Sequence, residues 1–83
     1  MKRLYEILWR VETDVVTLLY REFGAFHSEA EARQYGKKRE RELNNGEPIE
    51  QQALEGYYFK YLGVCEVQEI DGLKVQLICP QNS

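Results

Sequence analysis

The residues able to act as nucleophiles or general bases are few in this sequence. His27 is the only histidine, and the two cysteines are Cys65 and Cys79. A catalytic thiol needs a neighbouring base or cation that lowers its pKa, and neither cysteine has a histidine or a basic cluster beside it in the chain. His27 directly precedes a predicted helix start, where an exposed side chain is the ordinary case. We therefore expect no catalytic residues and a protein that is not an enzyme.

Metal and cofactor sites are not indicated by the residue spacing either. Two cysteines and one histidine cannot supply the four ligands of a zinc site. The six glycines occur singly along the chain, so no phosphate-binding loop is present. Glu66 and Glu69 fall on opposite faces of a predicted strand, which excludes them as a catalytic acid pair. We expect no cofactor and no metal.

Composition indicates one small folded domain over residues 1–83. Hydrophobic residues make up 43% of the chain and charged residues 30%, the balance of an ordinary globular protein. A net charge of -3 disfavours general binding to nucleic acid or to anionic membranes. No apolar run reaches the length of a signal peptide or a membrane span. With only two cysteines, both in apolar runs, we expect reduced, buried thiols and a cytoplasmic location.

The segment from residue 4 to residue 23 is compatible with two structures. Its apolar residues recur at helical spacing, which allows one amphipathic helix. Residues 11–17, however, are rich in β-branched side chains, which favour strands. Apolar and charged residues also alternate over residues 5–12. We predict two strands joined near Thr13-Asp14, with the single helix as the alternative.

The next segment carries a strong helix-start signal. Ser28 can cap a helix, and Glu31, three residues later, can complete a capping box. The helix should run to about Leu43 and end at residues 44–46, where Asn and Gly can adopt the left-handed conformation. A short helical turn is expected within residues 47–56, which begin near a proline and end in a glycine.

The remaining chain predicts a β-hairpin with strands over residues 57–70 and 73–79. A two-residue loop would pair polar with apolar side chains across the hairpin. A three-residue loop over residues 70–72 pairs Val67 with Val75 instead, and we predict that register. The fold class is thus α+β, a four-stranded antiparallel sheet in the order β-β-α-β-β along the chain, with one main helix packed on one face.

A basic cluster in the predicted helix supplies one candidate binding site. Lys37, Lys38, Arg39 and Arg41 could contact phosphates, which favours a nucleic-acid-binding protein as the alternative function. Glutamates interrupt the cluster, and its charges can pair at three- and four-residue spacing. We interpret it primarily as a solvated helix face, and we regard binding to nucleic acid as the less favoured function.

The Tyr-rich strand supplies the other candidate site, because its apolar residues do not simply alternate and both of its faces require cover. If Phe59 and Tyr61 point at the helix, the opposite sheet face carries an exposed apolar patch, the pattern of a protein interface. The patch would consist of Leu8, Tyr58, Leu62, Val64 and Ile78. The alternatives are that the chain ends or residues 47–56 cover this face, or that a bulge at Gly63 flips the strand.

Two stretches, FHSEAEA at residues 26–32 and FKYLGVCEVQEI at residues 59–70, resemble small bacterial domains of unknown function with a strand-strand-helix-strand core. The resemblance covers about a quarter of the chain and agrees with the predicted topology. It implies a bacterial or phage origin and no particular activity. The sequence as a whole predicts a non-catalytic protein-binding module, acting as a regulator, an inhibitor or an immunity-type partner, or as a homodimer.

Overall fold

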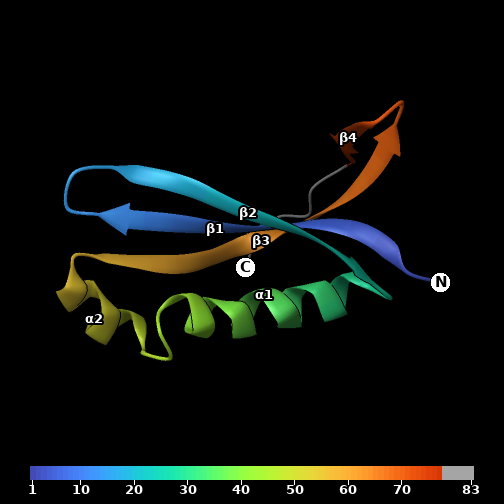
Figure 1. Ribbon diagram of the computed structural model, residues 1–83. Coiled ribbons are helices and arrows are strands. Elements are labelled where there is room, and N and C mark those ends of the chain that lie inside the picture. The colour runs from blue at the N-terminus through green and yellow to red at the C-terminus, as the bar shows by residue number, and fades with distance from the viewer. Residues whose placement is uncertain (78–83) are drawn as a thin grey trace.

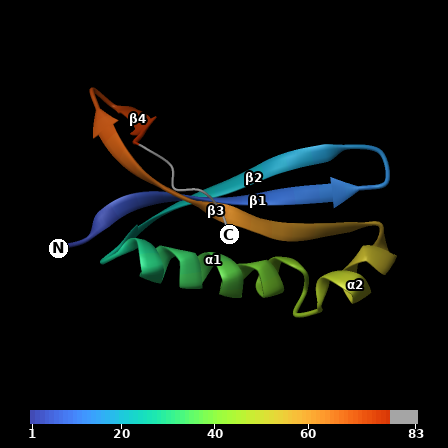
Figure 2. The ribbon, with the colours of Figure 1, turned by 180° about the vertical axis from the view of Figure 1, so that it is seen from behind.

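The computed structural model describes residues 1–77, which form a four-stranded antiparallel sheet in the order β2-β1-β3-β4 with helices on one side (Figure 1). The view from behind shows the same arrangement, with the β3–β4 end bending away from the helices (Figure 2). The predicted α+β fold is confirmed. In chain order the elements are β1 Arg3–Thr13, β2 Thr17–Phe26, α1 Glu29–Leu43, α2 Ile49–Gln52, a 3-10 turn Ala53–Glu55, β3 Tyr57–Ile70 and β4 Leu73–Gln76.

The first two strands form a hairpin, so the alternative of a single N-terminal helix is wrong. Thr13 closes the turn: its backbone N–H donates to the carbonyl of Val16 over 3.0 Å, and its hydroxyl accepts from the Val16 N–H over 2.9 Å. The ladder continues to the pair Arg3 and Phe26 without interruption. A threonine side chain thus replaces the missing turn glycine.

The main helix begins and ends where the sequence predicts. The Ser28 hydroxyl accepts from the Glu31 N–H over 3.2 Å, and the Glu31 carboxylate accepts from the His27 N–H over 3.0 Å. At the other end Asn45 and Gly46 adopt positive φ angles of 59° and 80°. These residues satisfy backbone groups that a helix end leaves unpaired.

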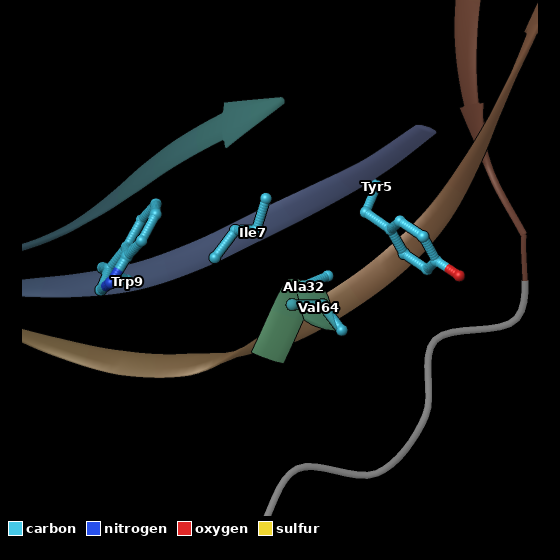
Figure 3. Close-up of a cluster of buried hydrophobic side chains, with 5 residues drawn as sticks. All are labelled: Tyr5, Ile7, Trp9, Ala32 and Val64. Carbon is cyan, nitrogen blue, oxygen red and sulfur yellow. The ribbon is translucent and has the colours of Figure 1, made fainter. Parts of the chain in front are cut away.

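The core lies between α1 and the sheet. Alternate residues of β1 point at the helix, and the buried cluster consists of Tyr5, Ile7, Trp9, Ala32 and Val64 (Figure 3). Half-buried aromatic rings extend this cluster along the sheet, with the Tyr20 ring 5.6 Å from those of both Trp9 and Phe59. Large aromatic side chains let a short chain bury enough apolar area to be stable.

A β-bulge midway along β3 changes which of its residues point at the helix. Leu8 pairs with Gly63 but Trp9 pairs with Tyr61, so Leu62 is the extra residue. Val64 therefore points at the helix and is 2% exposed. The prediction that Val64 lies on the open face is wrong, and the alternative of a bulge near Gly63 that flips the strand describes the structure.

The second hairpin has a two-residue loop, so the predicted three-residue loop is wrong. Ile70 pairs with Leu73, and Asp71 and Gly72 both have positive φ, 51° and 83°. Two such residues form the turn whose twist matches a β-hairpin. Val67 consequently pairs with Gln76 rather than with Val75. Mixed polar and apolar pairing costs little there, because the hairpin beyond Val67 is exposed on both faces.

Candidate interaction surface

The sheet face opposite α1, called here the open face, is formed by alternate residues of β1 and their partners on β2. Leu8 lies opposite Arg21, and Phe23 lies opposite Glu6. Leu19 and Phe23 are 56% and 44% exposed, whereas Leu8 is half-buried. The exposed apolar side chains of this face are therefore gathered on β2, at the edge of the sheet.

Charged and polar side chains border the apolar residues of the open face. Glu6 is 1% exposed, and its carboxylate accepts hydrogen bonds from Arg21 over 2.9 Å and from the Gln76 amide. The ammonium of Lys74, on β4, lies 5.4 Å from the centre of the Phe23 ring. The β3–β4 hairpin thus leans over part of the open face, and Leu19 lies beyond these contacts.

Glu22, on the helix side of β2, is the shared acceptor of a hydrogen-bond network. Its carboxylate accepts from the hydroxyl of Tyr20 over 2.7 Å, from that of Tyr35 over 2.8 Å and from the Arg39 guanidinium over 3.0 Å. Partial burial acts to raise the pKa of Glu22, but these donors outweigh it and hold the pKa below its ordinary value. The network fixes α1 against β2 and so sets the position of the sheet edge.

The residues predicted as an interface are only partly brought together. Leu8 and Tyr58 belong to the open face, because their neighbours on β1 and β3 alternate with the core residues. Both are half-buried, as is Leu62 at the bulge. Val64 is part of the core, and Ile78 lies outside the described residues.

Sequence reasoning missed Leu19 and Phe23, the most exposed apolar residues of the open face on β2. The signal was present, since β2 reads TLLYREFGAF and Leu19, Arg21, Phe23 and Ala25 occupy alternate positions. The predicted interface was placed on the Tyr-rich strand instead, because sequence patterns do not reveal the bulge in that strand.

The basic cluster of α1 does not present four equivalent cations. Arg39 is held by Glu22 and Glu42, and the hydrogen bond to Glu22 is the main reason that its pKa is raised. The Arg41 guanidinium donates to the Gly46 carbonyl over 2.9 Å and thereby stabilises the turn that follows the helix. Lys37 and Lys38 are exposed.

Groups with potential chemistry are separated. His27 is exposed beside the cap of α1, and its backbone N–H binds Glu31. Cys65 is buried and disulfide-bonded, so the expectation of a reduced thiol is wrong for this residue; Cys79 lies outside the described residues. Within residues 1–77, no three histidine, cysteine or acidic side chains are grouped as a metal would require.

No helix in the described part of the chain has both the length and the apolar character needed to cross a membrane. No protein-family model matches the sequence, and no curated protein or solved structure matches it. The resemblance to small bacterial domains stays an expectation from the sequence alone.

Proposed function

We propose that the chain is a non-catalytic protein-binding module whose interaction surface lies on β2. The observation that carries this proposal is the exposure of Leu19 and Phe23, 56% and 44%, on a strand at the edge of the sheet. Large apolar side chains that face solvent on one strand face, here on either side of Arg21, are found at sites that a partner covers. An edge strand adds unpaired backbone groups, to which a partner strand can bind.

The proposed surface combines anchors with charges. Phe23 supplies a large ring, and the Lys74 ammonium lies 5.4 Å from its centre. Arg21, two residues earlier on β2, pairs with Glu6. Aromatic and arginine side chains carry much of the affinity at protein interfaces. A regulator, an inhibitor or an immunity-type partner would act in this way, by occupying another protein rather than by transforming a substrate.

The disulfide at Cys65 favours an oxidising compartment over the cytoplasmic location expected from the sequence, because disulfides persist mainly in oxidising compartments.

The proposal is tested by capturing proteins from an extract of the source organism on the immobilised chain. Leu19→Glu and Phe23→Glu should each abolish capture, because each places a charge where an apolar contact forms. The matched control is the double variant Lys37→Glu, Lys38→Glu, which should capture the same protein as the wild type. Retention of capture by both β2 variants, or its loss in the double lysine variant, would contradict the proposal. Capture that weakens steeply with added salt would favour nucleic acid binding.

A further inference from the structure

We propose that a cavity beside α2, called here the α2 cavity, binds an arginine side chain presented by a polypeptide segment of a partner protein. The cavity has a volume of about 230 Å³ and is lined by Asn45, Glu47, Gln51, Gln52 and Glu55. This volume is several times the roughly 30 Å³ that one water occupies, so a side chain can enter. α2 lies on the helix side of the sheet, at the end where β1 turns into β2 (Figures 1 and 2). The site is therefore separate from the open face and goes beyond the function proposed for it.

The side chain of Gln52 is the observation that points to a ligand. It is 1% exposed, and its Oε1 atom accepts from the Asn45 amide over 3.2 Å. Its Nε2 atom is buried and has no hydrogen-bond partner within residues 1–77. Nearly all buried N–H donors in proteins are paired, because an unmade hydrogen bond leaves the cost of desolvation uncompensated. Since Oε1 is already occupied, Gln52 offers a donor to the α2 cavity, and the ligand must supply an acceptor such as a carbonyl oxygen.

The rim of the α2 cavity is acidic. Residues 44–58 contain three glutamates and no lysine or arginine. Glu47 and Glu55 are exposed, and neither forms an ion pair in the part of the chain that the structure describes. The turn that supplies Glu55 also borders a smaller hollow of about 100 Å³, whose lining includes Glu12 and Asp14. Negative charge thus continues toward the β1–β2 turn, and this end of the molecule attracts cations.

The unpaired donor and the acidic rim together select the ligand. An anion would accept from Gln52, but Glu47 and Glu55 would repel it. A metal ion would suit the carboxylates, but it provides no acceptor for a buried N–H group. An arginine within a polypeptide satisfies both requirements, because its guanidinium donates to carboxylates through a planar fork and its backbone supplies a neutral carbonyl. Free arginine is less suitable, since its own carboxylate is repelled by the rim.

An NMR titration with a blocked tripeptide, acetyl-Gly-Arg-Gly amide, tests the proposal. The side-chain amide resonances of Gln52 should shift saturably, because its Nε2–H group gains an acceptor. The same peptide with citrulline in place of arginine lacks the charge and should bind about tenfold more weakly or less. Free L-arginine should also bind more weakly than the blocked peptide. No shift of the Gln52 resonances at the highest soluble peptide concentration, or equal affinity for the citrulline peptide, would overturn the proposal.

Charge-matched variants test whether the peptide binds in the α2 cavity. Glu47→Gln and Glu55→Gln should each weaken binding of the arginine peptide about fivefold or more, because each removes a carboxylate from the rim. Glu50→Gln is the matched control: it removes the same charge from an exposed position on α2 outside the cavity lining, and it should bind as the wild type does. Equal weakening by all three variants would reflect only the overall charge and would contradict the site.

Gln52→Met tests the buried donor, because it keeps the length of the side chain and removes the N–H group. It should weaken binding of the peptide about threefold or more, with folding checked by circular dichroism. The variants of the exposed glutamates decide the outcome if this variant does not fold. Calcium chloride alone should leave the Gln52 resonances in place, and a saturable shift with calcium but not with the peptide would identify a metal site and refute the proposal. Phe23→Glu should bind the peptide normally, so the α2 cavity and the open face can fail independently.

Discussion

The indole Nε1 of Trp9 donates a hydrogen bond to the carbonyl oxygen of Gly36 over 3.0 Å, joining the centre of β1 to the centre of α1. This contact requires the helix to lie close to the sheet. Gly36 allows the approach, since a Cβ there would come within 2.4 Å of the Tyr61 ring and 2.9 Å of Ile7. The indole N–H of Trp9 and the missing side chain of Gly36 therefore set the distance between the helix and the sheet.

Replacement of Trp9 tests this contact. Trp9→Phe removes the donor and leaves a small cavity beside Ile7, so the free energy of unfolding should fall by about 2–4 kcal/mol. Urea denaturation followed by circular dichroism gives the value. Tyr58→Phe, at a half-buried position outside the core cluster, is the control and should change stability by less than about 0.5 kcal/mol.

Gly36→Ala tests the close approach. Alanine is the better helix former by about 1 kcal/mol, but the clash with Tyr61 should outweigh this and destabilise the protein by about 1–3 kcal/mol. Combining it with Tyr61→Val should restore part of the loss, because the ring atoms in the way are removed. A stabilising effect of Gly36→Ala alone in thermal denaturation would show that the helix does not lie this close.

Asn44 forms a two-point contact with the backbone of β3. Its amide donates to the Phe59 carbonyl over 2.9 Å and accepts from the Phe59 N–H over 2.8 Å, and the residue is 1% exposed. Asn44→Ala should therefore cost about 2–4 kcal/mol, since two backbone groups lose their partner. Asn44→Asp keeps the acceptor but sets a buried carboxylate oxygen against the Phe59 carbonyl, so it should cost at least as much as Asn44→Ala at neutral pH. Wild-type stability of Asn44→Ala in urea denaturation would contradict this role.

The Glu22 network predicts a pH dependence. The pKa of Glu22 is lower in the folded protein than its ordinary value of 4.5, so its stabilising effect is complete above that pH. The effect is lost as pH falls through the folded pKa. Glu22→Gln should cost about 1 kcal/mol at pH 7, and this difference should shrink below pH 4.5. Thermal unfolding of dilute protein measures it, with Glu50→Gln, at an exposed residue, as the control.

The positions of the helices and strands follow from local sequence signals. Which side chains of a strand point into the core does not. Ser28 and Glu31 mark the start of α1 because capping depends on neighbouring residues alone. The bulge at Leu62 depends on how β1 and β3 fit together, and it moved Val64 from the open face to the core. The double role of Asn44, as helix terminator and as partner of Phe59, also needs tertiary contacts.

The sequence predicts that one face of the sheet is exposed, but it does not predict which strand carries the exposed apolar residues of that face. An uncovered sheet face follows from one helix on a four-stranded sheet. Leu19 and Phe23 are exposed on this face because β2 lies at the edge of the sheet, and strand order cannot be read from a single sequence. Leu8 and Tyr58, named from the sequence, lie on the same face but are half-buried.

Backbone amide exchange along β2 tests the central claim most directly. If the outer edge of β2 is an interface, the amides of Leu19, Arg21 and Phe23 should exchange slowly in the presence of the captured protein and rapidly in its absence. Those of Tyr20 and Glu22, which face β1, should stay protected in both cases. Rapid exchange at Leu19, Arg21 and Phe23 in the presence of the captured protein would contradict the claim.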